Sequence, residues 1–439
     1  MDIRINKGIA SGNVTAPPSK SYGHRMLICA ALAEGSSVVR RISSSEDMLA
    51  TLDCVAALGV EAELTGDTCV LGGRRPEVCA EIPGKKSVGR QPEDTTGNGL
   101  GLQKETSQAS DGRNGELPVY RCRESGSTLR FFIPIALALT GGGVFTGAER
   151  LMERGIGIYE DLFIPQGISI EKFKDHIDIR GQLKAGDMKV PGNVSSQFIS
   201  GLLFALPLLK EDSTLEIIPP VESRAYIDIT IDAMKLFGVE ITETEKNHFY
   251  IRGSQHYKPQ DTEVEGDWSN AAFLYAIQHL AAERLNILGL NSQSIQGDRV
   301  CLEYFDRLLK GDGEVLDISG CPDLGPVLFA FAAACCGGRF TGIRRLRIKE
   351  SDRARVMAEE LAKMGLKAEV LENDMIIPAG SLKCPAVPID GHNDHRIVMA
   401  MAVLLLITGG VISGAEAVRK SYPEFFEVLN SMGIDTQVL

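Results

Sequence analysis

Apolar and polar positions follow one pattern six times along the chain. Each time, a turn of small or polar residues, often with glycine or proline, precedes a helix that is apolar on nearly every side. The six segments are PSKSYGHRMLICAALA (18–33), ESGSTLRFFIPIALAL (124–139), PGNVSSQFISGLLFALPLL (191–209), GDWSNAAFLYAIQHLAA (266–282), CPDLGPVLFAFAAACCGG (321–338) and HNDHRIVMAMAVLLLITGG (392–410). A helix without a polar face belongs inside a bundle. We therefore expect six buried helices whose N-terminal ends can converge on one place.

A short strand-like segment follows each of these helices, and a second, amphipathic helix follows most of the strands. Residues 225–243 and 353–372 show the second helix clearly, with Gly238 and Gly365 placed to end it. Glycine readily adopts the left-handed conformation that closes many helices. The pattern predicts an α/β protein built from six helix–strand–helix–strand repeats.

Residues 84–116 do not belong to this pattern. The segment is rich in glycine, serine, threonine, glutamine and charged residues. Such a composition cannot bury enough apolar surface to order the chain. We expect a flexible insertion between two strands of the first repeat.

Composition narrows the class of protein. A chain of 439 residues has room for two or three domains, and its formal charge of −12 argues against a partner that is a nucleic acid. The ten cysteines include no C-x-x-C pair, which suits reduced thiols. The segment MDIRINKGIA lacks a signal-peptide core, and the longest apolar run, from Ile397, is too short to span a membrane. The expectation is a cytoplasmic protein with no membrane contact.

The first apolar helix begins with an unusual set of charges. Lys20, Ser21 and Arg25 stand together at its start, although cations near a helix N-terminus oppose the helix dipole. A bound phosphate would remove the conflict, because free N–H groups at that end bind anions. An ordinary helix cap with two solvated cations is the alternative at this stage.

Comparable groups stand at or near the other helix starts. They are Gly126, Ser127 and Arg130; Arg150 and Arg154; Ser195, Ser196 and Gln197; Ser223, Arg224 and Tyr226; Lys349, Glu350, Asp352 and Arg353; Arg396; and Arg419 and Lys420. Taken singly, each group can be a helix cap or a solvated surface residue. Repetition at the same point of the repeat instead favours a substrate with more than one anionic group, since guanidinium groups pair well with carboxylate and phosphate.

Several motifs are missing from the sequence. It has no G-x-x-x-x-G-K-[ST], and no G-x-G-x-x-G follows a strand, so nucleotide and dinucleotide sites are unsupported. His392 and His395 have a spacing found in metal sites, but no third ligand stands nearby. We expect neither a metal nor an organic cofactor.

Nine blocks together resemble the EPSP synthase family of the shikimate pathway, and they occur in that family's order over almost the whole chain. The blocks are PSKSYGHR, ESGSTLR, PGNVSSQF, SRAYIDIT, VEGDWS, CPDLGP, RIKESDRA, NDHRIVMA and RKSYPEFF. The resemblance implies a two-domain inside-out α/β barrel, with six βαβαββ-type repeats and helix N-termini facing the interdomain cleft. It implies an N-terminal globe of residues 18–264 and a discontinuous C-terminal globe of residues 1–17 plus 265–439.

The resemblance also implies a reaction and its residues. The enolpyruvyl group of phosphoenolpyruvate would pass to the 5-hydroxyl of shikimate-3-phosphate through a tetrahedral intermediate. Asp323, Glu350 and Lys20 would be catalytic. Shikimate-3-phosphate would be bound by Lys20, Ser21, Arg25, Ser195, Ser196, Gln197, Ser223, Arg224, Tyr226, Asp323 and Lys349. Phosphoenolpyruvate would be bound by Lys20, Gly126, Arg150, Gln197, Lys349, Arg353, Arg396 and Lys420. The protein would be a monomer.

Two positions depart from the family's pattern. Glu124 and Arg345 stand where comparable members carry asparagine, and Arg345 either packs beside the substrate ring or faces outward. Gly126 keeps the side-chain-free position that lets phosphoenolpyruvate, or the inhibitor glyphosate, approach the backbone. The resemblance therefore implies sensitivity to glyphosate.

Three alternatives remain at this stage. A UDP-N-acetylglucosamine enolpyruvyl transferase shares the barrel but uses a reactive cysteine that the segment GAERLMERG lacks. A relative of the RNA cyclases would need basic patches and a nucleotide site, and neither is visible. A non-catalytic anion-binding paralogue would be expected to lose Asp323, Glu350 or Lys20, and all three are present.

Overall fold

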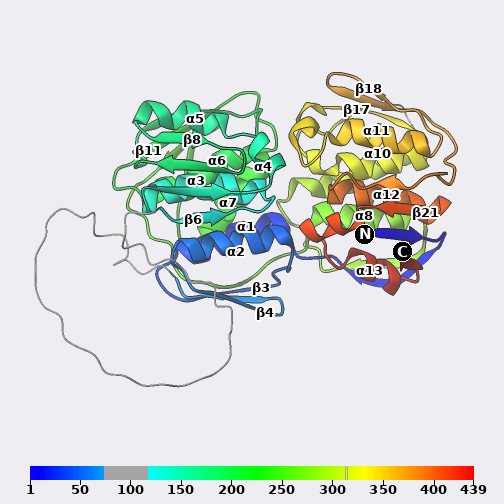
Figure 1. Cartoon of the computed structure of the whole chain (residues 1–439), viewed down its shortest axis with the longest axis horizontal. Coiled ribbons are helices and arrows are strands. Elements are labelled where there is room, and N and C mark those ends of the chain that lie inside the picture. Colours follow the sequence, from blue (N-terminus) through cyan, green and yellow to red (C-terminus); the bar gives the residue numbers. More distant parts are fainter. Residues whose placement is uncertain (74–116, 312, 314) are drawn as a thin grey trace, which may run out of the picture.

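Two globes lie side by side in the computed structural model, each with its own hydrophobic core (Figure 1). The structure describes residues 1–73, 117–311, 313 and 315–439. Buried residues between 22 and 264 form the core of what we call the N-terminal globe. Buried residues between 3 and 14 and between 268 and 434 form the core of the C-terminal globe. The whole of the predicted insertion at 84–116 lies outside the described residues.

The N-terminal globe carries three of the sheets. Its helices are α1 (Lys20–Leu32), α2 (Glu46–Ala57), α3 (Gly126–Leu139), α4 (Glu149–Glu153), α5 (Gly157–Phe163), α6 (Ser196–Ala205) and α7 (Arg224–Leu236), with 3-10 turns η2 (Ile164–Gln166) and η3 (Leu206–Leu208). Its strands are β3 (Ser37–Arg40), β4 (Ala62–Thr65), β5 (Thr68–Leu71), β6 (Val119–Arg121), β7 (Gly142–Thr146), β8 (Ser169–Lys172), β9 (His176–Arg180), β10 (Asp187–Pro191), β11 (Ser213–Ile218), β12 (Thr242–Glu245), β13 (His248–Ile251) and β14 (Asp261–Glu263).

The C-terminal globe carries the other three sheets. Its helices are α8 (Trp268–Leu280), α9 (Cys301–Lys310), α10 (Gly325–Ala334), α11 (Arg353–Lys363), α12 (His395–Thr408) and α13 (Phe425–Ser431), with η4 (Gly297–Val300), η5 (Pro322–Leu324), η6 (Arg344–Ile348) and η7 (Ala415–Lys420). Its strands are β1 (Asp2–Ile5), β2 (Ala10–Thr15), β15 (Ala282–Leu288), β16 (Val315–Asp317), β17 (Gly338–Thr341), β18 (Glu369–Val370), β19 (Asp374–Ile377), β20 (Ile389–Asp390), β21 (Gly410–Ser413) and β22 (Thr436–Val438).

One strand arrangement recurs through both globes. Five four-stranded sheets have the orders β14-β3-β5-β4, β6-β7-β9-β8, β10-β11-β13-β12, β16-β17-β19-β18 and β20-β21-β1-β22. In each, the first two strands are parallel and the others are antiparallel. The sixth sheet, β15-β2, holds only the parallel pair. The chain is thus a mixed α/β protein of six related sheets.

The apolar helices lie inside the globes, as their sequences predict. In α12, every residue except Ile407 is buried, and α8 and α10 pack against it. In the N-terminal globe, α6 contacts both α3 and α7, while α1 contacts α7. Gly238 and Gly365 follow the ends of α7 and α11 with φ values of +79° and +87°, so the prediction that they end these helices is confirmed.

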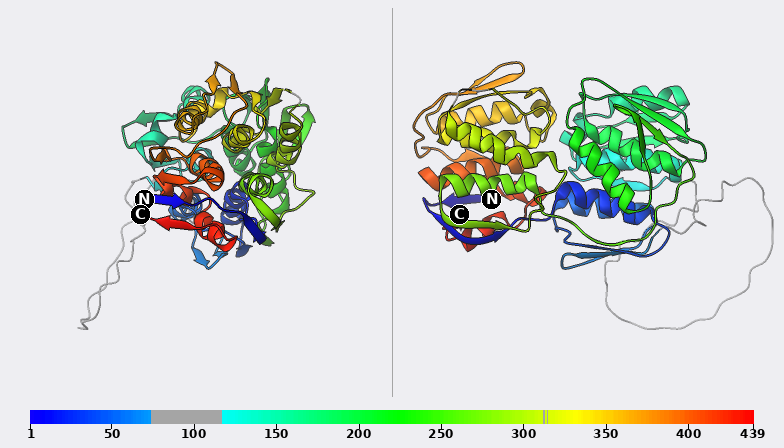
Figure 2. Two further views of the ribbon diagram at one scale, coloured as in Figure 1. Left: turned by 90° about the vertical axis from the view of Figure 1, so that its right-hand side faces the viewer. Right: turned by 180° about the vertical axis from the view of Figure 1, so that it is seen from behind.

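Two passages of chain connect the globes, and they lie next to each other (Figure 2). Ser19 N donates to Glu265 O at 2.8 Å, and Asp267 N donates to Pro17 O at 2.8 Å. Each passage leads directly into a helix, α1 on one side and α8 on the other. The starts of these two helices are therefore fixed to each other at the junction of the globes.

Two further expectations concern the described residues. Among them, no helix has the length and apolar character needed to cross a membrane. The nine cysteines in this part of the chain are all free thiols.

Candidate active site

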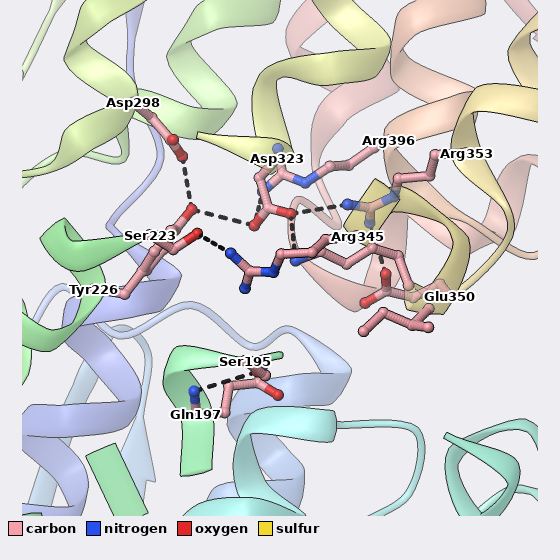
Figure 3. Close-up of polar contacts among 12 residues, drawn as sticks. Ser195, Gln197, Ser223, Tyr226, Asp298, Asp323, Arg345, Glu350, Arg353 and Arg396 are labelled. Carbon is pink, nitrogen blue, oxygen red and sulfur yellow. Dashed lines mark hydrogen bonds and ion pairs between the residues drawn. The ribbon is translucent and has the colours of Figure 1, made fainter. Parts of the chain in front are cut away.

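A polar cavity lies at the junction of the two globes (Figure 3). Its lining comes from the starts of α1, α3, α6 and α7 in one globe and from η5, η6, α11 and α12 in the other. The lining residues are Lys20, Ser21, His24, Arg25, Asp47, Gly126, Ser127, Arg154, Ser195, Ser196, Gln197, Ser223, Tyr226, Asp323, Arg345, Lys349, Glu350, Arg353, His395 and Arg396. Five of the six apolar helices predicted to converge, α1, α3, α6, α10 and α12, place residues at or directly before their starts in this lining, whereas α8 places none.

Arg25 lies within the cavity wall without an acidic partner. Its guanidinium donates to Thr230 Oγ1 at 2.7 Å, to Tyr226 O at 2.9 Å and to Ser21 O at 2.8 Å, and it stacks on Phe131. Among the described residues, no carboxylate forms an ion pair with it. Burial lowers the pKa of Arg25 to about 10. A buried cation held by neutral groups favours an anion beside it.

Lys20 stands at the start of α1, where Ser19 is the N-cap. Its Nζ lies 2.9 Å from Asp47 Oδ2 on α2. Burial lowers the pKa of Lys20, but the charges of Asp47 and Glu350 raise it more, so that the pKa lies above its ordinary value. Lys20 therefore carries its proton at neutral pH.

Asp323 is surrounded by cations. Its Oδ1 lies 2.8 Å from Arg353 Nη1 and 3.1 Å from Lys349 Nζ, and its Oδ2 lies 3.5 Å from Arg396 Nη2. Burial raises the pKa of Asp323, but Lys349, Arg396 and Arg353 outweigh burial and hold that pKa well below its usual range. The carboxylate is thus ionised and well neutralised.

Arg353 organises the acidic side of the cavity. It is 1% exposed, and its guanidinium contacts Asp394 at 2.9 Å, Asp323 at 2.8 Å and Glu350 at 2.7 Å. Asp394 also caps α12 by accepting from Arg396 N. Burial raises the pKa of Glu350, but Arg353 and Arg154 lower it well below its usual range.

Arg396 keeps one hydrogen-bonding position open. Its Nη1 is buried and has no hydrogen-bond partner among the described residues. Burying a donor without a partner costs free energy. Since Arg396 lines the cavity, this nitrogen is suited to an anionic ligand.

Three of the predicted binding residues do not line this cavity. Arg150 is on the surface of α4 and pairs with Glu153 at 3.2 Å. Arg224 pairs with Asp228 and Glu243, both at 2.7 Å. Lys420 donates to Glu124 and to Asn393 O. All the other predicted site residues line the cavity together.

Several residues at the cavity were not assigned to either substrate from the sequence. Arg154 lies one helical turn after Arg150, and its Nε donates to Ile348 O of the other globe at 3.1 Å. Its neighbour Arg130 is buried, and burial together with Arg154 lowers the pKa of Arg130 to about 9. The sequence indicated Arg130 and Arg154 as candidate anion-binding residues, because both lie near helix starts. Asp47 gave no signal, because it lies on an amphipathic second helix.

Arg345 faces the junction of the two globes and not the solvent. Arg345 is 7% exposed, and its Nη1 donates to Ser223 Oγ at 2.6 Å across the junction of the globes. The interpretation in which it faces outward is therefore wrong. Glu124, the other departure, also reaches across the junction, to Lys420 and Asn393.

Together with Arg130, Arg154, Ser195, Gln197 and Lys349, Arg345 also lines an adjoining chamber of about 280 Å³. A cavity of this kind, with clustered cations and two ionised carboxylates, is typical of an enzyme that acts on small polyanions.

The family model for EPSP synthase (3-phosphoshikimate 1-carboxyvinyltransferase) matches residues 6–87 and 102–429, and the chain belongs to this family. It is 37% identical over 452 residues to the 3-phosphoshikimate 1-carboxyvinyltransferase of Clostridium perfringens (strain ATCC 13124), covering 98% of each chain. It is 37% identical over 452 residues to that of Clostridium kluyveri, covering 98% of this chain and 97% of the other. Among solved structures, an EPSP synthase from Acinetobacter baumannii has a TM-score of 0.73 at 23% identity, with all of both chains covered, which shows a shared fold.

Proposed function

We propose that the chain transfers the enolpyruvyl group of phosphoenolpyruvate to the 5-hydroxyl of shikimate-3-phosphate, releasing phosphate. The observation that carries this proposal is the open Nη1 of buried Arg396 in a cavity where Arg25 also lacks an acidic partner among the described residues. The two substrates carry two carboxylates and two phosphates between them. Family membership supplies the identity of the substrates.

Within this proposal, the substrates divide the cavity between them. Shikimate-3-phosphate is held by Lys20, Ser21, Arg25, Ser195, Ser196, Gln197, Ser223, Tyr226, Asp323 and Lys349. Phosphoenolpyruvate is held by Lys20, Gly126, Gln197, Lys349, Arg353 and Arg396. Arg150, Arg224 and Lys420 would have to leave their acidic partners to join them.

The reaction is an addition followed by an elimination. Asp323 removes the proton of the 5-hydroxyl as the oxygen attacks C2 of phosphoenolpyruvate, and C3 accepts a proton. Because the pKa of Glu350 is depressed and that of Lys20 is raised, the pair starts with its proton on Lys20. We assign the supply of that proton to the Lys20–Glu350 pair. The transfer is completed when the tetrahedral intermediate loses phosphate from C2 and a proton from the C3 methyl group, which restores the double bond. The surrounding cations stabilise the developing charge.

The finer architecture belongs to the same proposal. We assign residues 18–264 to the N-terminal globe and residues 1–17 plus 265–439 to the C-terminal globe, each an inside-out barrel of three βαβαββ-type repeats. The six parallel strand pairs support this division. We further propose a cytoplasmic monomer that glyphosate inhibits at the phosphoenolpyruvate position, next to Gly126.

Release of phosphate from phosphoenolpyruvate tests the proposal. The purified chain should release phosphate with shikimate-3-phosphate and not with UDP-N-acetylglucosamine. Asp323→Asn should bind shikimate-3-phosphate with near-normal affinity and turn over about 10²- to 10⁴-fold more slowly, the usual range for acid–base catalysis. Phosphate release only with the UDP-sugar would make the chain the related transferase, and binding without release would make it an anion-binding protein.

A further inference from the structure

Asp298 is a buried carboxylate behind the wall of the cavity and has no part in the proposed substrate contacts. It lies in η4, is 4% exposed and is absent from the cavity lining. Its Oδ2 is 3.0 Å from the hydroxyl of Tyr226, which belongs to α7 of the other globe. The same hydroxyl is 3.3 Å from Asp323 Oδ2 (Figure 3). Tyr226 therefore stands between two carboxylates, one inside the cavity and one behind it.

The single hydroxyl proton of Tyr226 faces two carboxylates, those of Asp298 and Asp323. A phenol has one proton and donates it to one acceptor at a time, while its oxygen can accept a hydrogen bond in return. When both aspartates are ionised, Tyr226 donates its proton to one of them. The other carboxylate then lies against the Tyr226 oxygen with no proton to form a hydrogen bond. With one proton added, both contacts of the Tyr226 oxygen are satisfied: a carboxylic acid donates to Tyr226, and Tyr226 donates to the other carboxylate. The three groups thus have a place for one additional proton.

The environments of the two aspartates indicate where that proton resides. Arg353, Lys349 and Arg396 surround Asp323, which makes it a weak base by itself. Burial, reinforced by the charge of Asp323, raises the pKa of Asp298 to about 6. Asp298 is ionised above that pH and holds a proton more firmly than Asp323 does.

The groups that face Asp298 come from every element around it. They are Asp323 in η5, Cys321 directly before η5, Arg396 on α12, Asp267 and Ser269 at the start of α8, Cys301 on α9 and Tyr226 on α7. Arg396 and the Ser269 hydroxyl favour the ionised form, whereas Asp323 and Asp267 favour the protonated form. Burial also keeps both thiols protonated, since it raises the pKa of Cys301 and of Cys321.

We infer that Asp298, acting through Tyr226, is the final acceptor of the proton that Asp323 removes from the substrate hydroxyl. The inference rests on the proposed function. The substrate O–H bond breaks, its proton joins Asp323, the proton of Tyr226 passes to Asp298 Oδ2, and the proton on Asp323 passes to the Tyr226 oxygen. Asp323 and Tyr226 end as they began, and only Asp298 has changed. Asp298 is a positioning residue and does not touch the substrate.

The test compares Asp298→Asn, Tyr226→Phe and the double variant with the wild-type chain. A matched control is Asp306→Asn, the same change at an exposed position of α9. The inference predicts that kcat falls about 10- to 100-fold in each single variant, less than the 10²- to 10⁴-fold typical of removing the acid–base group itself, because Asp323 remains in place. The double variant should lose little more than either single one, because both remove the same path. Affinity for shikimate-3-phosphate should stay near normal in Asp298→Asn, measured by calorimetry without turnover.

The pH profile of kcat separates this role from a structural one. In the wild-type chain kcat should fall at low pH with a midpoint near pH 6, because a protonated Asp298 cannot accept the substrate proton. In Asp298→Asn this acid limb of the profile should disappear or move. An unchanged kcat and acid limb in Asp298→Asn would overturn the inference, as would additive losses in the double variant. If Asp298→Asn does not fold, the pH profile of kcat is measured in Tyr226→Phe instead. A retained acid limb in that variant would overturn the inference. No turnover of shikimate-3-phosphate by the wild-type chain would instead overturn the proposed function.

Discussion

Arg345 of the C-terminal globe donates a hydrogen bond to Ser223 of the N-terminal globe, with 2.6 Å between Nη1 and Oγ. Its Nε also reaches Val194 O at 3.2 Å and lies 3.6 Å from Glu222 Oε2. One guanidinium therefore joins η6 to the starts of both α6 and α7. It is one of several side chains that join the two globes, together with Arg154 and Lys420.

Shortening this side chain should loosen the junction. In Arg345→Asn the amide is too short to reach Ser223, so we expect a larger radius of gyration for the unliganded chain by small-angle scattering. Arg344→Asn is the matched control, because Arg344 is exposed and its guanidinium pairs with Glu372 of its own globe. Equal radii for the wild-type chain and Arg345→Asn would show that other contacts hold the globes.

Ser223 and Arg224 are neighbours in sequence with opposite placements. Ser223 lines the cavity, whereas Arg224 is held by Asp228 and Glu243 outside it. Ser223→Ala should weaken binding of shikimate-3-phosphate by about 10- to 100-fold, the loss expected for a hydrogen bond to a charged group. Arg224→Ala should change that affinity by less than about threefold, because Arg224 does not line the cavity and its guanidinium is held by Asp228 and Glu243. Calorimetric titration of both variants measures the difference, and a larger loss in Arg224→Ala would move Arg224 into the site.

Lys349 should give the reaction an alkaline limit. Burial, opposed by the charge of Asp323, lowers the pKa of Lys349 to about 8. The side chain is therefore cationic below that pH and neutral above it, so attraction for the substrate anions is present at pH 7 and is lost as the pH rises through 8. We expect kcat/KM, which reports on the free enzyme, to fall above pH 8. Lys349→Arg should move this limb to higher pH; an unmoved limb would assign it to another group.

The carboxylate of Glu124 forms an ion pair with the ammonium group of Lys420, which belongs to the opposite globe. In Glu124→Asn that neutralising charge is absent, and Lys420 is freer to meet an anion. We expect KM for phosphoenolpyruvate and the inhibition constant of glyphosate both to fall. Glu424→Asn is the control, since Glu424 is an exposed acid close to Lys420 in sequence. A rise in KM would show that Glu124 positions Lys420 for its role.

The helix starts made much of the site predictable from sequence. Lys20, Ser195 and Gln197 each follow a turn and precede an apolar helix, so a repeat found in the sequence also indicates where their side chains meet. Arg154 was harder to select, because Arg150 lies one turn earlier on the same short helix and only the packing against Ile348 distinguishes them.

Asp47 and Asp298 could not be found in this way. Asp47 faces the cavity because α2 packs on α1, and Asp298 meets Tyr226 only because the two globes are joined. Contacts of this kind depend on how helices and globes pack against one another. No local pattern of residues in the sequence predicts that packing. The same is true of the partners that hold Arg224 and Lys420.

The sheet β20-β21-β1-β22 has a consequence for how the protein is made. Strand β1 (Asp2–Ile5) pairs with β21 (Gly410–Ser413) on one edge and with β22 (Thr436–Val438) on the other. The ribosome therefore releases β1 first, and the whole N-terminal core is synthesised before either neighbour of β1 exists. The nascent chain must carry β1 unpaired, with Ile3 and Ile5 still outside their core, until synthesis is nearly complete. Only then can the C-terminal globe close around it.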